Sequence, residues 1–120
     1  MSEHDEQKTL FSWAAYANGR FPELKLMFAI PNGGHRHKAV ASKMKAEGVK
    51  AGVPDIFLPA PRGGYHGLFI EMKYGRNKAS QPQLRWIDAL AAAGYLAIIC
   101  YGFEDAQENI ISYLEMETES

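Results

Sequence analysis

The 120-residue chain has a single cysteine, Cys100, and no apolar stretch long enough to cross a membrane. One cysteine excludes a framework of disulfide bonds, and its apolar neighbours Ala97 to Ile99 indicate a packing role in a buried strand. Without an apolar run of about 20 residues, the sequence predicts no membrane-spanning helix. The first residues are polar and acidic, so we expect no secretory signal and a cytoplasmic location.

The chain also lacks a large net charge, which is −1 at pH 7, but its charges are unevenly distributed. Residues 35 to 85 carry ten Lys or Arg against three acids, a balance of +7. Residues 86 to 120 carry seven acids and neither Lys nor Arg. Such asymmetry is typical of a protein that contacts a nucleic-acid backbone, although the lysines at 38 to 50 alone also fit a solvated helical face.

Hydrophobic periodicity and turn residues predict one α/β domain over residues 1–120, with a central mixed sheet flanked by helices. Helices are predicted at 3–17, 38–47, 80–93 and 104–114. Strands are predicted at 26–30, 55–59, 67–74 and 95–101, the middle two joined by a hairpin-like loop at 61–64. Ser80 is the predicted N-cap of the third helix.

Two acids and a lysine occupy unusual positions in this pattern. Asp55 ends the run Gly52-Val53-Pro54-Asp55 before an apolar strand, and Glu71 and Lys73 lie in the next strand. Because side chains alternate along a strand, Glu71 and Lys73 share one face while Ile70 and Met72 share the other. Charged groups buried on such a face are costly unless they have a partner or a function.

A divalent cation is the partner that fits Asp55 and Glu71. Mg²⁺ is commonly held by one or two carboxylates together with retained waters and substrate phosphate oxygens. Lys73 beside such an ion can orient or deprotonate an attacking water. The alternative is a buried Glu71–Lys73 ion pair that only stabilises the sheet.

The first helix offers a third acid. Leu10, Trp13, Ala14 and Ala17 form an apolar stripe, and extending that stripe towards the N-terminus reaches Glu6. We therefore expect Glu6 to reach the site at the sheet. Glu3 and Asp5 are interpreted as first-turn acids that complement the helix dipole, although the sequence leaves open whether Glu3 replaces Glu6.

In order and spacing, these motifs resemble the virus-type replication-repair nuclease (VRR-NUC) domain of the PD-(D/E)XK superfamily. The resemblance runs from about Glu6 to about Gly102 and includes the turn at 31–34, Gly-Val-Pro-Asp, Glu-x-Lys and the segment at 80–83. It implies a restriction-endonuclease-like PD-(D/E)XK core around the sheet. It also implies a metal-dependent DNA endonuclease, with Mg²⁺ or Mn²⁺ as cofactor.

Site residues follow from the resemblance one by one. Asp55, Glu71 and the backbone carbonyl of Met72 would bind the metal, with Glu6 binding it directly or through water. Lys73 would be the base or the water-orienting group. Gln83 matches the family glutamine, although Gln81 stands where the family has proline and Pro82 is shifted by one position.

The residues expected to contact DNA lie mainly in the basic segment. His35 and Arg36 follow a glycine turn whose backbone can approach a phosphate, although a solvated loop or, less readily, a metal site also fits them. The full set is Asn32, Gly33, Gly34, His35, Arg36, Lys38, Lys50, Arg76, Lys78 and Ser80.

Short stand-alone members of this family resemble Holliday-junction resolvases that act as homodimers in replication, recombination or repair. We therefore expect a homodimer that prefers branched or four-way DNA, encoded by a phage or prophage and acting in the cytoplasm of a bacterial host. Two alternatives remain: a restriction-type endonuclease that cuts a short duplex sequence, and a DNA-binding module without catalytic turnover.

Overall fold

The computed structural model describes residues 1–31 and 38–118 and contains one mixed four-stranded sheet. The helices are α1 (Glu3–Ala17), the 3₁₀ helix η1 (Pro22–Leu26), α2 (Lys38–Ala46), α3 (Gln81–Ala92) and α4 (Gly102–Leu114). The strands are β1 (Phe28–Ala29), β2 (Ile56–Leu58), β3 (Leu68–Lys73) and β4 (Leu96–Tyr101). The predicted α/β class and mixed sheet are confirmed.

The sheet order is β1-β2-β3-β4, with the first two pairs antiparallel and β3 parallel to β4. The register pairs Ile56 with Ile70 and Leu58 with Leu68. Because side chains alternate, these residues and Met72 share one face, whereas Phe57, Phe69 and Glu71 share the other. The register therefore fixes which residues face each helical layer.

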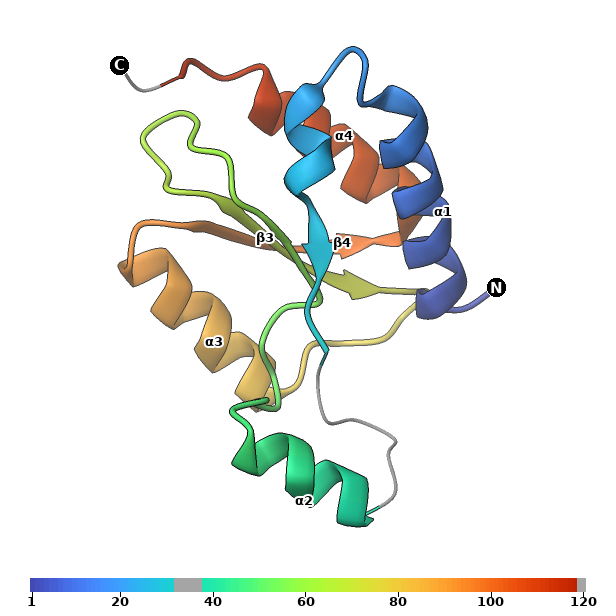
Figure 1. Ribbon diagram of the computed structural model, residues 1–120, viewed down its shortest axis with the longest axis vertical. Helices are drawn as coiled ribbons and strands as arrows, with labels where there is room; N and C mark the ends of the chain where they lie inside the picture. The colour runs from blue at the N-terminus through green and yellow to red at the C-terminus, as the bar shows by residue number, and fades with distance from the viewer. Residues whose placement is uncertain (32–37, 119–120) are drawn as a thin grey trace.

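Helices α1 and α4 pack against each other over the first of these faces (Figure 1). Leu10 of α1 and Ile110 of α4 are completely buried there against Ile56, Ile70 and other strand residues. Helix α3 contacts β4 on the opposite face, where Tyr95 packs edge-on against Phe57 and Phe69. One sheet face thus holds the apolar core, and the other combines an aromatic cluster with Glu71 and Lys73.

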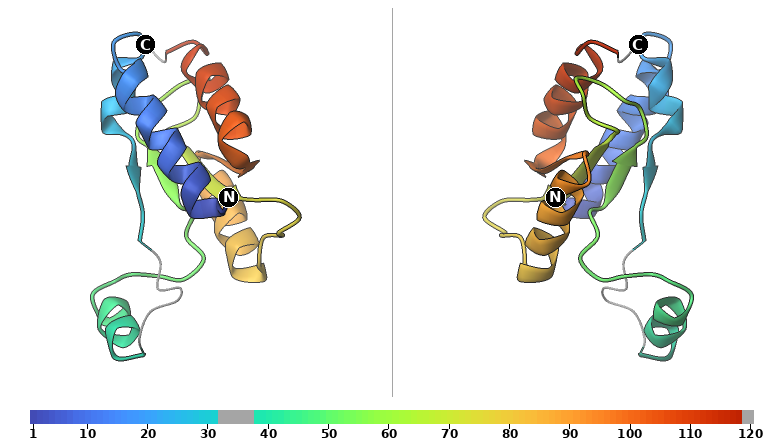
Figure 2. Two further views of the ribbon diagram at one scale, coloured as in Figure 1. Left: turned by 90° about the vertical axis from the view of Figure 1, so that its right-hand side faces the viewer. Right: turned by 90° about the vertical axis from the view of Figure 1, so that its left-hand side faces the viewer.

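Helix α2 lies apart from the sheet, as Figure 2 shows from two sides. None of its nine residues is buried in the described structure. The chain reaches α2 after β1 and returns to the sheet at β2, so α2 is an excursion between two neighbouring strands.

Two predicted elements begin two residues away from their observed start, whereas the other boundaries agree to within one residue. The strand expected at 26–30 contains only Phe28–Ala29, because Pro22–Leu26 forms a 3₁₀ helix instead. The last helix begins at Gly102, two residues before the predicted start at Glu104. Its first turn is stabilised because the Asp105 carboxylate accepts a hydrogen bond from the Tyr101 amide at 2.8 Å.

The loop between β2 and β3 is held to the core by buried polar contacts. Arg62 Nε donates to the Leu114 carbonyl at 3.2 Å, and its guanidinium pairs with Glu23 of η1. The Tyr113 hydroxyl donates to the Ala60 carbonyl at 2.6 Å in a buried position. These contacts fix the hairpin that brings β2 and β3 together.

Tyr113→Phe should lower the free energy of unfolding by about 1 to 3 kcal/mol, because the substitution leaves the buried Ala60 carbonyl without its donor. The matched control Tyr16→Phe changes a hydroxyl on a residue that is 91% exposed and should alter stability by less than about 0.5 kcal/mol. Urea denaturation followed by circular dichroism measures both. Equal stabilities for the two variants would contradict the role given to the Tyr113 hydroxyl.

Candidate active site

The Gly-Val-Pro-Asp segment places Asp55 at the start of β2. Gly52 has φ of +90°, and a Cβ there would lie 2.9 Å from the carbonyl carbon of Pro82, so only glycine lets the chain pass the beginning of α3 this closely. The Asp55 carbonyl accepts from the Ile30 amide at 2.7 Å, and its Oδ2 accepts from the Met72 amide at 2.8 Å. Strands on both sides therefore fix Asp55.

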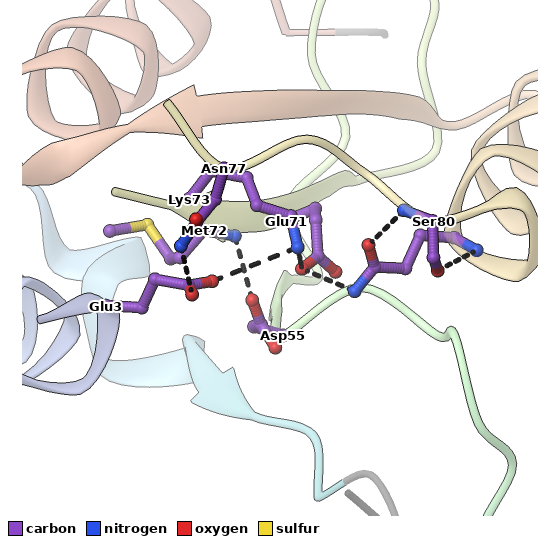
Figure 3. Close-up of polar contacts among 8 residues, drawn as sticks. Glu3, Asp55, Glu71, Met72, Lys73, Asn77 and Ser80 are labelled. Atoms are coloured by element: carbon purple, nitrogen blue, oxygen red, sulfur yellow. Dashed lines mark hydrogen bonds and ion pairs between the residues drawn. The ribbon is translucent and has the colours of Figure 1, made fainter. Parts of the chain in front are cut away.

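Glu71 lies on β3 with a side chain that is only 2% exposed (Figure 3). Its Oε2 accepts a hydrogen bond from Gln83 Nε2 at 3.1 Å and lies 3.6 Å from Lys73 Nζ. Its Oε1 is buried and accepts no hydrogen bond from any described residue. A buried acceptor without a donor is unfavourable unless a cation or water binds there.

Burial raises the pKa values of both acids, and the nearby Asp55 raises the pKa of Glu71 further. The pKa of Glu71 rises from 4.5 to about 8, first because burial disfavours its charged form and next because Asp55 lies close by. Burial also raises the pKa of Asp55, although the hydrogen bond from Met72 opposes the rise. Two carboxyl groups held together in this way favour either a shared proton or a cation.

Gln83 is held by the start of α3. The Ser80 hydroxyl accepts from the Gln83 amide at 3.3 Å, while Gln83 Oε1 accepts from the Ser80 amide at 2.8 Å. This reciprocal capping box leaves Gln83 Nε2 directed at Glu71. Gln83 therefore contacts the site as expected, whereas exposed Ser80 serves as the predicted N-cap and orients Gln83.

Lys73 is 8% exposed and contacts two carboxylates. Its Nζ lies 3.6 Å from Glu71 Oε2 and 3.9 Å from Glu3 Oε1. Glu3 Oε2 in turn accepts from Asn77 Nδ2 at 3.3 Å. The first helix thus contributes an acid beside the lysine.

That acid is Glu3, and the expectation that Glu6 completes an acidic cluster does not match the geometry. Glu6 Oε1 accepts from the Phe103 amide at 3.1 Å, at the start of α4. Tyr101 supplies no side-chain cap to α4, so the Glu6 carboxylate satisfies an otherwise free amide of its first turn. Among the described residues, no three His, Cys, Asp or Glu side chains gather closely enough to hold a metal.

Asp55 and Glu71 nevertheless form a donor set that suits Mg²⁺ or Mn²⁺. Both provide hard carboxylate oxygens, and Glu71 Oε1 is a buried acceptor with no hydrogen-bond donor among the described residues. Mg²⁺ is often held by only one or two carboxylates together with waters and phosphate oxygens. The residues therefore fit a small divalent cation, with the Met72 carbonyl as a further candidate ligand.

Apart from Ser80, the expected DNA contacts fall into two groups. Lys38, Lys50, Arg76 and Lys78 are exposed, and the last two lie in the loop that follows Lys73. Asn32, Gly33, Gly34, His35 and Arg36 lie outside the described residues. Arg62, which contributes to the +7 balance, is only 8% exposed and bonded to Glu23 and Leu114, so its role is structural.

Of two further contacts at the site, the sequence prediction left one open, that of Glu3, and missed the other, that of Asn77. Glu3 was interpreted as a dipole-complementing acid, although the stripe that indicated Glu6 leads one helical turn further back to Glu3. Asn77 carries no sequence signal, because an asparagine between Arg76 and Lys78 is ordinary for a polar loop. Its contact with Glu3 joins residues 74 positions apart.

The sequence and the fold of this chain are both similar to those of known proteins. A family model described as the VRR-NUC domain matches residues 2–104. A solved structure described as a VRR_NUC domain protein is 30% identical, with a TM-score of 0.84 over 98% of this chain and 92% of that chain. No curated protein matches. No described helix has the length and hydrophobicity needed to span a membrane.

The raised pKa of Glu71 predicts how the stability of the metal-free protein depends on pH. Between 4.5 and about 8 the folded state holds a proton on Glu71 that the unfolded chain has lost. The free energy of unfolding should therefore fall as pH rises through this range. Thermal unfolding in a chelating buffer measures the fall, which should be much weaker in Glu71→Gln because the amide does not ionise.

Addition of Mg²⁺ at about pH 8 should raise the thermal midpoint of the wild type and not that of Glu71→Gln, because the cation stabilises the ionised pair. Identical pH profiles for the two proteins in the absence of Mg²⁺ would contradict the raised pKa of Glu71, and equal responses to Mg²⁺ would contradict its role in binding the cation.

Proposed function

The chain belongs to the VRR-NUC domain family, and on this premise we propose that it is a Mg²⁺- or Mn²⁺-dependent endonuclease that hydrolyses phosphodiester bonds in DNA. Family membership indicates a nuclease. The observation that carries the proposal is the pairing of buried Asp55 and Glu71 beside Lys73, whose Nζ is 3.6 Å from Glu71 Oε2. Two acids and a lysine at one sheet end are the groups that hydrolysis of a phosphodiester requires.

Each residue has a defined task in this reaction. Asp55 and Glu71 would hold the cation, which would supply Lewis-acid polarisation of the phosphate and of the attacking water. Lys73 orients the attacking water and offsets negative charge that develops on the phosphate oxygens. The water oxygen bonds to phosphorus and the bond from phosphorus to the 3′ oxygen breaks, leaving a 3′ hydroxyl and a 5′ phosphate. Gln83 keeps the Glu71 carboxylate in place throughout.

Basic side chains around the site support DNA as the substrate. Exposed Arg76 and Lys78 lie three and five residues after Lys73 in the chain. Lys50 lines a cavity of about 350 Å³ with Trp86, and Arg85 lines a cavity of about 340 Å³ that also includes Trp86. Positive charge on these exposed segments favours binding of a phosphate backbone.

Asp55→Ala, Glu71→Ala and Lys73→Ala should each reduce DNA cleavage by about a hundredfold or more, because each removes a group from the reacting site. Plasmid nicking in Mg²⁺ or Mn²⁺ measures the loss, and circular dichroism verifies the fold. Lys8→Ala and Glu108→Ala remove similar charges at exposed positions of α1 and α4 and should cut like the wild type. Wild-type cleavage by all three site variants would refute the assignment.

We further propose a homodimer that prefers branched DNA, because a two-fold arrangement of sites can nick two strands of a four-way junction. The domain itself contacts DNA through backbone-directed basic residues, which fits recognition of DNA shape over sequence. The phage or prophage origin and the cytoplasmic location stay predictions from the resemblance.

Light scattering at micromolar concentration should give the mass of a dimer, and a four-way junction should be cut faster than linear duplex of the same sequence. Junction binding in Ca²⁺ followed by exchange into Mg²⁺ or Mn²⁺ separates the alternatives. Discrete fragments from linear plasmid would favour a restriction-type enzyme. Binding without cleavage would favour a module that has lost turnover, and a monomer that cuts duplex equally well would refute the junction preference.

A further inference from the structure

The loop between β3 and α3 carries exposed basic residues and one contact back to the site. Its chain turns immediately after Lys73, where the Asn77 amide donates to the Tyr74 carbonyl at 3.3 Å. Arg76 and Lys78 lie on either side of Asn77 and are exposed. The loop therefore places two cations that fit phosphate groups next to the strand that bears Glu71 and Lys73.

Glu3 links this loop to Lys73 with its two carboxylate oxygens, as Figure 3 shows. Oε1 lies 3.9 Å from Lys73 Nζ, and Oε2 accepts from Asn77 Nδ2 at 3.3 Å. The carboxylate comes from the first turn of α1, which packs against α4 and reaches β3. Helix α1 thus presents one acid both to the strand that bears Lys73 and to the polar loop that follows this strand.

Lys73 needs such a second anion if it is to orient water. Its ammonium is carried on a flexible stem with four rotatable bonds, and Glu71 alone would draw it onto the carboxylate that is to hold the cation. With Glu3 opposite, the ammonium lies between two acids at 3.6 and 3.9 Å. The second acid therefore restrains the position of Lys73 without adding a third carboxylate to the metal-binding pair.

We propose that Glu3 and Asn77 are positioning residues: Glu3 holds Lys73 in place for the attacking water, and Asn77 holds Glu3 while fixing Arg76 and Lys78 in register with the site. The inference rests on the proposed nuclease function and deepens it. It assigns roles to one residue interpreted from sequence as a helix-dipole acid and to another that carried no signal. Both act through Lys73 and the loop, not on the substrate directly.

Variants of Glu3 and Asn77 test the ion pair with Lys73 and the Glu3–Asn77 hydrogen bond one at a time. Glu3→Gln keeps an oxygen that can accept from Asn77 but removes the charge beside Lys73, whereas Asn77→Ala keeps the ion pair and removes the hydrogen bond. Glu3→Asp keeps the charge on a shorter side chain. Single-turnover cleavage in Mg²⁺, junction affinity in Ca²⁺ and the thermal midpoint are measured for each variant and for the double variant Glu3→Gln/Asn77→Ala.

Glu3→Gln should slow cleavage by about tenfold to a hundredfold while junction affinity changes less than about twofold, because a displaced catalytic group affects the rate more than binding. Asn77→Ala should slow cleavage by about threefold to tenfold. The double variant should cut at most about twofold more slowly than Glu3→Gln, because both residues act on Lys73 through the same Glu3 side chain. Glu3→Asp should recover part of the rate lost in Glu3→Gln.

Glu108→Gln removes the same charge from an exposed position on α4 and should cut at the wild-type rate. The positioning role is overturned if Glu3→Gln cuts DNA as fast as the wild type. It is also overturned if the only effect of Glu3→Gln is weaker junction binding or a lower thermal midpoint. In either case a wild type that cuts DNA leaves the nuclease assignment in place. A wild type that cuts no DNA in either metal overturns the nuclease assignment and the positioning role with it.

Discussion

The burial of two carboxyl groups side by side is the constraint around which the rest of the site is arranged. Asp55 and Glu71 lie among apolar strands, where ionisation of both is unfavourable without compensating positive charge. The surrounding groups each reduce that cost: the Met72 amide, the Gln83 amide and the Lys73 ammonium. A cation bound by both acids would supply the remaining compensation. A feature that is unfavourable for folding is therefore the one that the proposed chemistry would use.

Local signals in the sequence predicted much of the fold. Helix α1 covers Glu3–Ala17 as predicted, because its N-cap and apolar stripe lie within one short segment. Ser80 caps α3, and β2 and β3 pair as the apolar runs and the turn between them indicated. Asp55, Glu71 and Lys73 could be selected for the same reason, since charge inside an apolar strand is visible without knowledge of any partner.

Contacts between distant segments could not be predicted in this way. Glu6 was expected at the site, but an unsatisfied amide at Phe103, 97 residues away, fixes its carboxylate elsewhere. Arg62 counts as a positive charge in the sequence, and only the fold reveals that it is buried against η1 and α4. Helical spacing shows which residues share a face, but it does not show which of them meets the active site and which meets another helix.

The excursion that carries α2 is structurally independent of the hydrophobic core. The chain leaves the sheet after β1 and re-enters at the adjoining strand β2, and no residue of α2 in the described structure is part of the core. Insertions, deletions or charge changes in such a segment leave the hydrophobic core and the buried acids untouched. The sheet that holds the buried acids therefore tolerates changes of length and charge in this segment without a change in its own packing.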